Sequence, residues 1–146
     1  MHDPKKIARA FLIEGDVDIK MAKLAYINSF YSRSIFFSQQ ASEKAVKACL
    51  VMKGIFSTDH NNASLFRALY CDCIEGFPAL LSSVERLEKI GAKARFPLFQ
   101  RSDLPIWIPS NSFREDEARE SLEKGEIVFN RLREFLQFEI LAAQDR

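Results

Sequence analysis

Three polar side chains with useful chemistry recur on one side of a predicted helix. Gln40, Glu43 and Lys47 are spaced three and four residues apart, which places them on one helix face at about 100° per residue. One interpretation is an ordinary surface pair, because Glu43 and Lys47 at i,i+4 stabilise a helix by about 0.2–0.5 kcal/mol. Apolar Phe36 and Leu50 border the three residues, however, which favours a groove or a subunit interface where polar groups must find partners. We call Gln40, Glu43 and Lys47 the polar stripe.

His60 is a second candidate, and it lies in a polar loop after the helix of the polar stripe. A lone histidine in a loop is usually a cap or a surface group. Catalysis would need a second group beside it, such as an acid, an arginine or another histidine. The other histidine, His2, is close to the N-terminus.

Arg95 is the best single candidate for holding a phosphate, since its guanidinium fork matches phosphate geometry. It lies in a long irregular stretch, residues 91–112, where positive charge gathers around the aromatic residues Phe96, Phe99 and Trp107. The basic residues are Lys89, Lys93, Arg95 and Arg101. Basic and aromatic residues together are typical of sites that bind phosphates and stack bases. We favour the simpler interpretation, in which the aromatic residues fold this loop back onto the protein.

Composition favours one ordinary globular domain over residues 1–146. The 47% hydrophobic and 28% charged residues are usual for such a domain. A net charge of +1 gives no general attraction to nucleic acid or to anionic membranes. No long apolar run indicates a signal peptide or a membrane span, so we expect a cytoplasmic protein.

The three cysteines predict no disulfide framework and no metal site. Cys49 lies on a predicted helix, whereas Cys71 and Cys73 are separated by one residue without a second ligand pair nearby. We interpret all three as small buried residues. No cofactor-binding motif is present, and we expect neither a metal nor a cofactor.

The chain predicts an all-α fold, an antiparallel up-and-down bundle of four to five helices with one long loop before the last. Five glycines and five prolines punctuate it, and no alternating run predicts a strand. Ser112 and Glu115 have the spacing of a capping box at the start of the last helix, and a break near Gly15 is left open. The expected helical regions are 4–30, 31–53, 63–90 with an interruption at 76–78, and a last one after 112.

Four segments in order resemble the HEPN family, the helical domains of prokaryotes and higher eukaryotes. They are DIKMA (18–22), QQASEKAVKACLVMKG (39–54), DH (59–60) followed by LF, and ARFP (94–97). The closing helix also fits, so the resemblance covers about residues 16–137. It implies a helical bundle that commonly forms homodimers. Many members are encoded with, or fused to, a minimal nucleotidyltransferase, and several branches are metal-independent ribonucleases.

This resemblance, rather than spacing alone, places Gln40, Glu43, Lys47, His60 and Arg95 in an inter-helical groove or dimer region. The ribonuclease branches carry an arginine four to six residues before the histidine, and none stands there before His60. We therefore expect a homodimeric, non-catalytic nucleotide- or RNA-associated module that works with a nucleotidyltransferase-like partner.

Two alternatives remain open. One is a toxin-type ribonuclease whose composite site joins His60, Arg95 and Lys53 across a dimer. The other is an interaction scaffold that binds no ligand.

Overall fold

The computed structural model describes residues 2–144, and side chains as far as residue 140. Within that range the protein consists of five α-helices and one short 3-10 helix, as the sequence predicts, without a β-strand. None of these helices is long and apolar enough to cross a membrane. The elements are α1 (Pro4–Ile27), α2 (Tyr31–Met52), α3 (Ala63–Tyr70), α4 (Phe77–Arg95), η1 (Pro109–Asn111) and α5 (Glu115–Gln144).

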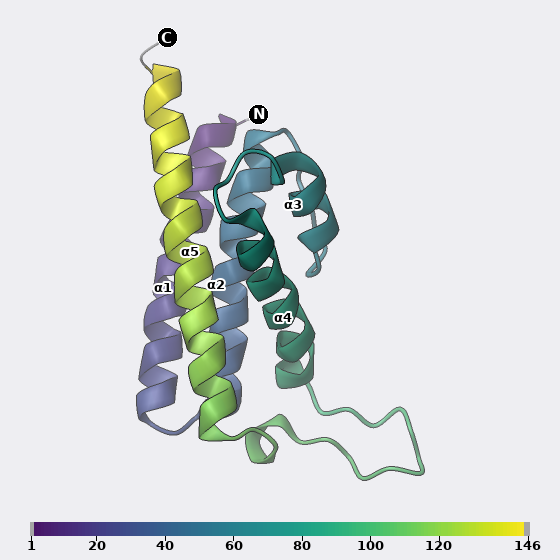
Figure 1. Ribbon diagram of the computed structural model, residues 1–146. Helices are drawn as coiled ribbons and strands as arrows, with labels where there is room; N and C mark the ends of the chain where they lie inside the picture. The colour runs from purple at the N-terminus through teal and green to yellow at the C-terminus, as the bar shows by residue number, and fades with distance from the viewer. Residues whose placement is uncertain (1, 145–146) are drawn as a thin grey trace.

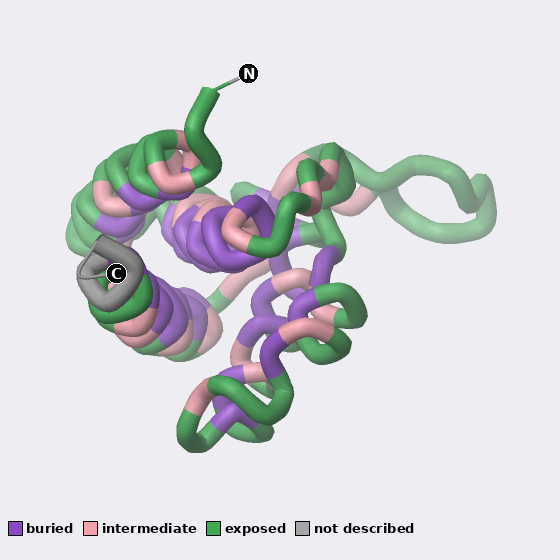
Figure 2. The backbone as a smooth tube through the Cα atoms, turned by 90° about the horizontal axis from the view of Figure 1, so that it is seen from above, coloured by how far each residue is buried: buried purple, intermediate pink, exposed green. Residues whose placement is uncertain are grey.

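Helix α2 lies at the centre of the bundle. Helices α1 and α5 pack on one side of it, and α4 with the short α3 packs on the other (Figure 1). The view along the bundle shows α2 buried on most of its surface, whereas α1 and α5 keep exposed outer sides (Figure 2). Ala41, Ala45 and Ala48 are fully buried, and their small side chains let neighbouring helices approach α2 closely.

Helix α1 continues through Gly15 without a break. Asp3 caps its first turn, because the backbone N–H of Lys5 donates to Asp3 Oδ1 at 2.9 Å. A Cβ on Gly15 would lie 2.6 Å from Cε2 of Phe129 on α5. The glycine therefore permits close packing of α1 against α5 and does not end the helix.

The predicted interruption between α3 and α4 is confirmed, but the predicted end of α4 is wrong. Gly76 has a left-handed φ of 67°, and α4 begins directly after it with Pro78 in its first turn. We expected the helix to stop at Ile90, yet it runs through Gly91 to Arg95. This extra turn carries Arg95 back toward the polar stripe.

The predicted capping box of α5 is also wrong. Ser112 Oγ donates to the carbonyl of Ile108 at 2.7 Å and takes no part in capping. Instead the backbone N–H of Arg114 donates to the Glu117 carboxylate at 3.0 Å. The side-chain-to-backbone half of a capping box thus forms two residues later than the sequence spacing indicated.

Residues 96–108 form an arm that extends away from the bundle (Figure 1). Leu98 and Trp107 pair across it in an isolated antiparallel bridge. The Trp107 indole donates to the carbonyl of Lys93 at 2.7 Å, so this aromatic residue folds back as expected. Phe96 and Phe99 do not, since both are about 70% exposed (69% and 70%).

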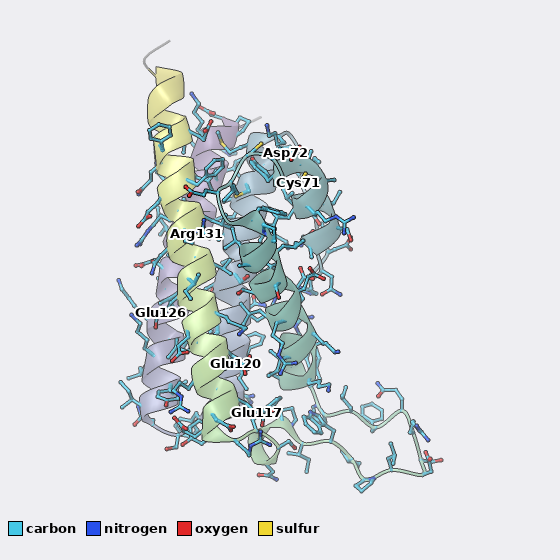
Figure 3. All side chains as sticks on the ribbon, viewed as in Figure 1. Cys71, Asp72, Glu117, Glu120, Glu126 and Arg131 are labelled. Atoms are coloured by element: carbon cyan, nitrogen blue, oxygen red, sulfur yellow. The ribbon has the colours of Figure 1, made fainter. Side chains whose placement is uncertain are left out.

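The cysteines differ from one another in burial. Cys49 is buried, as predicted, and its burial raises the pKa of the thiol. Cys71 and Cys73 are exposed, which contradicts the prediction. Both lie in the turn between α3 and α4, one on each side of Asp72 in the sequence. Figure 3 labels Cys71 and Asp72 in this turn. Because both cysteines lie in a surface turn, their side chains face solvent.

Candidate anion-binding site

Glu43 on α2 is the centre of a polar cluster. Its side chain is almost fully buried, yet three groups that can carry positive charge surround its carboxylate. Lys47 Nζ lies 3.5 Å away, His60 Nδ1 3.2 Å away and Arg95 Nη2 3.9 Å away. A buried carboxylate needs such partners, because an isolated one would be very costly.

Gln39 joins this cluster, and the sequence interpretation missed it. Its amide nitrogen donates to Glu43 at 3.2 Å, and its amide oxygen accepts from Gln40 at 2.9 Å and from Arg95 at 3.4 Å. The four-residue spacing from Gln39 to Glu43 was the available signal. All five predicted residues are thus brought together, with Gln40 reaching the others through Gln39. We call these six residues the Glu43 cluster.

Gly91 on α4 provides the space for Gln39. A Cβ at residue 91 would lie 2.4 Å from Cγ and 2.8 Å from Cβ of Gln39. Both distances are shorter than nonbonded carbons tolerate. The glycine therefore lets α4 approach α2 while the Gln39 side chain lies between them.

The loop before α3 fixes the position of His60. Asn62 is buried, and its side chain bonds both the Ser57 hydroxyl at 2.6 Å and the Asp59 carbonyl at 2.9 Å. Glu88 of α4 accepts from the backbone N–H groups of Asn62 and Ala63 at 2.8 and 3.1 Å. Burial raises the pKa of this Glu88 carboxyl despite those hydrogen bonds.

His60 keeps one ring nitrogen available. Its Nδ1 faces Glu43, while 59% of its side chain is exposed. Among the side chains that the structure describes, as far as residue 140, Nε2 has no hydrogen bond or ion pair. The Glu43 carboxylate thereby orients the imidazole so that the second nitrogen can reach a ligand from solvent.

Arg95 has few partners for its five N–H donors. Only 16% of its side chain is exposed. Its one hydrogen bond within the described part of the chain is the 3.4 Å contact to Gln39. The Nε atom is buried and has no hydrogen-bond partner among the described residues. A buried donor of this kind costs about 1–3 kcal/mol while it stays unpaired, so the geometry of Arg95 favours an added acceptor.

A separate ion pair explains the DIKMA segment. Asp18 on α1 and Lys44 on α2 are 2.5 Å apart, and both are largely buried. Burial raises the pKa of Asp18, and the Lys44 bond opposes that rise. This pair connects α1 to α2 on the side of α2 away from Arg95, and it is not part of the Glu43 cluster.

The predicted surroundings of the polar stripe need two corrections. Leu50 is fully buried and Phe36 packs against a core cluster of Ile35 and its neighbours, so neither leaves an apolar patch beside the stripe. Arg101 forms a bidentate pair with Asp103 in the arm, which neutralises part of the predicted basic region. Arg95 is the basic residue from that region that reaches the cluster.

The arrangement can hold an anion more readily than it can perform general acid–base catalysis. Lys47, His60 and Arg95 surround a single carboxylate, so positive charge exceeds negative charge by one even when the imidazole is neutral. One oriented imidazole supplies one proton acceptor or donor. No second imidazole joins the cluster, since His2 precedes α1 at the far end of the described chain.

Comparison with known proteins places these features in one family. The HEPN domain profile matches residues 8–135, which includes every residue of the Glu43 cluster. A curated relative, "Putative toxin MJ1304" of Methanocaldococcus jannaschii, is 29% identical over 138 residues and is covered to 90%, as is this chain.

Two solved structures share the fold. TT1696 from Thermus thermophilus superposes with a TM-score of 0.73, and ST0689, described as an archaeal HEPN homologue, with 0.66. Each is 20% identical, and each comparison covers 88% of this chain and 97% of the other. The profile match spans most of the sequence and agrees with the five-helix architecture. The chain belongs to the HEPN family.

Proposed function

We propose that the protein is a non-catalytic module that binds the phosphate of a nucleotide or RNA strand at the Glu43 cluster. The observation that carries this proposal is the state of Arg95. Within the described part of the chain its buried Nε lacks a hydrogen-bond partner, and its one hydrogen bond is long. A phosphate offers the bidentate acceptor that a guanidinium fits best. Lys47 and the free nitrogen of His60 would contribute the remaining contacts.

Phe96 extends the site toward a base. It follows Arg95 directly in the chain, and its ring is largely exposed. An aromatic ring beside a phosphate-binding cation is the arrangement that single-stranded nucleic acids use, and each stacked base contributes about 1–3 kcal/mol. With few charges and no glycine-rich cradle, we expect a Kd in the ~10⁻⁴–10⁻⁶ M range that weakens as salt rises.

The partners in this proposal follow from the family. We propose a homodimer that acts beside a nucleotidyltransferase-like protein. Membership of the HEPN family supports this setting, and the printed name of the Methanocaldococcus relative supports a toxin-type context. Pull-down from native extract with mass spectrometry of bound proteins tests the partner. Recovery of no nucleotidyltransferase-like protein would contradict that part of the proposal.

One observation favours a second candidate, a toxin-type ribonuclease. The Glu43 carboxylate orients His60 at 3.2 Å, as a carboxylate orients a general base. His60 would take the proton of a ribose 2′-hydroxyl. That oxygen would attack the neighbouring phosphorus, and the 5′-oxygen would depart with a proton from water. The products would be a 2′,3′-cyclic phosphate, a free 5′-hydroxyl and a protonated His60. Lys53, proposed from the sequence as a further member of such a site, instead lies over the Tyr70 ring at 5.4 Å.

Isothermal titration with a short single-stranded RNA tests the anion site. We expect Arg95→Ala to weaken binding at least tenfold, and Arg95→Lys to recover only part of it because lysine lacks the fork. Arg86→Ala is the matched control, since Arg86 is an exposed arginine on the same helix. Equal binding by the wild type and Arg95→Ala would refute the proposal.

A cleavage assay on the same RNA separates the two candidates. General acid–base help is typically worth about 10²–10⁴-fold, so His60→Ala would abolish most cleavage by a true ribonuclease. We expect no cleavage above that of His60→Ala. Rapid cleavage that is lost in this variant would establish the second candidate.

A further inference from the structure

The turn between α1 and α2 holds a serine where glycine is preferred. Ser29 has a left-handed φ of 63°, and it is the one non-glycine residue of the described chain with a positive φ. The N–H of Ser29 donates to the Tyr26 carbonyl at 3.0 Å, and the N–H of Phe30 donates to the Ala25 carbonyl at 2.8 Å. These bonds form a Schellman motif, whose left-handed position usually holds glycine. A serine there adds a hydroxyl group in spite of the backbone strain.

Helix α2 begins without a side-chain cap. Its N-cap residue is Phe30, which offers no oxygen to the first N–H groups, although small polar residues are strongly preferred there. The backbone N–H groups of Tyr31, Ser32 and Arg33 have no hydrogen-bond partner among the described residues. They lie at the positive end of the dipole of a 22-residue helix, which is equivalent to roughly half an elementary charge. Such a helix end favours an anion.

Ser32 provides a second and independent indication of a ligand. The residue is only 5% exposed, yet its hydroxyl forms no hydrogen bond within the described part of the chain. The next buried serines of α2 behave differently, because Ser34 donates to the Ala22 carbonyl at 2.9 Å and Ser38 donates to the Ser34 carbonyl at 2.7 Å. Buried hydroxyls are normally hydrogen-bonded in this way. The Ser32 hydroxyl therefore has room for a partner from outside the chain.

The Ser32 hydroxyl opens into a hollow. Arg95 Nε is the one side-chain atom of the described residues that is both sealed from solvent and unpaired, so the unpaired Ser32 oxygen must be open to solvent. Ser32 lines a hollow of about 410 Å³. The other lining residues are Ser29, Phe30, Tyr31, Arg33 and Ser110.

Two segments supply the walls of this hollow. One is the turn into α2, and the other is η1, which packs against α2 at the same end of the bundle (Figure 1). Hydroxyls of Ser29 and Ser110 thus join that of Ser32. Ser29 Oγ accepts from the Tyr31 hydroxyl at 3.5 Å, so its own proton stays available to a ligand. The largely exposed Phe30 gives the hollow an apolar side.

The hollow carries positive charge without a matching carboxylate in the described part of the chain. The first turn of α2 contains no acidic residue, and Arg33 forms no ion pair with a described side chain. The Glu115 carboxylate lies at this end of the bundle, but it accepts from the Tyr26 hydroxyl and pairs with Arg119 at 3.6 Å. An anion entering the hollow therefore meets unmatched positive charge.

We propose that the start of α2 binds a phosphate monoester in this hollow. Three N–H groups and three hydroxyls match the three terminal oxygens of a monoester, each of which accepts more than one hydrogen bond. A phosphodiester has fewer terminal oxygens and leaves donors unpaired. Arg33 neutralises part of the negative charge, and Phe30 contacts the organic group of the ester. We call residues 29–33 with Ser110 the α2-terminal site.

The α2-terminal site is separate from the Glu43 cluster and goes beyond the proposed function. Ser32 and Glu43 are eleven residues apart in α2, which corresponds to about 17 Å along the helix. The two sites have no residue in common. Binding at one can therefore fail while binding at the other persists.

Nuclear magnetic resonance of isotope-labelled protein, titrated with phenyl phosphate at constant ionic strength, tests the site. We expect saturable shifts of the backbone amide signals of Tyr31, Ser32 and Arg33. Ser32→Ala and Arg33→Gln should each weaken binding by roughly tenfold or more, as the loss of one hydrogen bond to a charged group predicts.

Ser34→Ala is the matched control for Ser32→Ala. Both serines are buried in the first turns of α2, but the Ser34 hydroxyl already has a partner in the protein. Ser34→Ala should lower Tm and leave the affinity for phenyl phosphate unchanged. Ser32→Ala should weaken binding and leave Tm unchanged, because the hydroxyl that it removes bonds no described residue.

Three probes distinguish the source of the phosphate. Inorganic phosphate, adenosine 5′-monophosphate and a 5′-phosphorylated RNA are compared in the Arg95→Ala variant, which weakens the Glu43 cluster. The same RNA with a 5′-hydroxyl is the control. Tightest binding of the nucleotide indicates a free nucleotide as ligand, and tightest binding of the phosphorylated RNA indicates a strand end. Equal binding of all three indicates recognition of the phosphate group alone, and each of these results supports a monoester site.

Three other results would overturn the inference. If the amide signals of residues 31–33 did not respond to phenyl phosphate, the start of α2 would be merely solvated. Equal affinity of the wild type, Ser32→Ala and Arg33→Gln would place the bound phosphate elsewhere. Equal affinity for phenyl phosphate and for the diester methyl phenyl phosphate would refute recognition of a monoester. The amide signals of residues 39–47 report on the Glu43 cluster in the same spectra, so failure of either site is seen separately.

Discussion

Replacing Gly91 by alanine tests whether Gln39 holds the Glu43 cluster together. The new methyl carbon would lie 2.4 Å from Cγ and 2.8 Å from Cβ of Gln39, so this side chain or helix α4 must move. Gln39 is fully buried and has no open direction in which to swing freely. Its bonds to Glu43 and Arg95 would then lengthen or break.

Two opposing effects decide the size of the change. Alanine in place of a helical glycine stabilises by roughly 0.5–1 kcal/mol through backbone entropy and helix propensity. Overpacking of a filled core costs about 1–3 kcal/mol, and two lost hydrogen bonds cost about 0.5–1.5 kcal/mol each. The cost is larger, and we expect Gly91→Ala to lower the free energy of unfolding by about 2 kcal/mol. For a domain of this size that lowers Tm by about 4–8 °C.

Urea unfolding gives the free energy, and titration with single-stranded RNA gives the state of the site. The free energy of unfolding and the affinity for RNA should both fall in Gly91→Ala. Adding Gln39→Ala removes Cγ and the amide, so the double variant should lose less stability than the two single losses added together. A Gly91→Ala protein as stable as the wild type, with unchanged binding, would show that the cluster does not depend on this close approach.

Three further changes have expected outcomes. Glu43→Gln keeps the shape but removes the only carboxylate of the cluster, so RNA binding should tighten while the free energy of unfolding falls by about 1–3 kcal/mol; titration and urea unfolding measure both. Burial raises the pKa of Asp18 above its usual 3.8. The contribution of this carboxyl to stability is therefore present below pH 3.8 and is lost as pH rises through the raised pKa. In Asp18→Asn, the free energy of unfolding measured in urea should depend less on pH across that acid range. Trp107→Phe removes the hydrogen bond to Lys93, so hydrogen exchange should quicken in residues 96–108 while the bundle keeps its protection.

The fold could be predicted from the sequence where local rules decide. Gly54 and Gly76 both adopt a positive φ, and each marks a helix boundary that the sequence indicated. Gly91 looks similar in sequence but stays inside a helix. Its role depends on the Gln39 side chain from a helix about fifty residues earlier, and local pattern contains no such information.

The sequence predicted five of the six residues of the Glu43 cluster, all except Gln39, but not how deeply each is buried. Helical spacing brought Gln40, Glu43 and Lys47 together, and the family resemblance added His60 and Arg95. A helical wheel shows which residues share a side but not which neighbour covers that side. Leu50 was therefore expected at an exposed border, whereas the structure buries it completely.

The same limit applies to the exposed apolar side chains. The expectation of a dimer rested on residues beside the polar stripe, yet the exposed apolar side chains of the bundle's helices concentrate on α1 and α5. Their outer sides read as ordinary amphipathic helix in the sequence, because isolated exposed apolar residues are normal. Only the side-by-side placement of α1 and α5 reveals one continuous face.

The Arg95→Ala variant separates a ligand site from a purely structural role of the Glu43 cluster. If Glu43, Lys47 and Arg95 only fixed the register of a dimer, Arg95→Ala would dissociate it. If Arg95 holds a phosphate, as we propose, Arg95→Ala should lose RNA binding and remain a dimer. Titration with single-stranded RNA and sedimentation equilibrium measure the two properties. Loss of the dimer, with no RNA bound by the wild type at low salt, would leave Arg95 a structural residue.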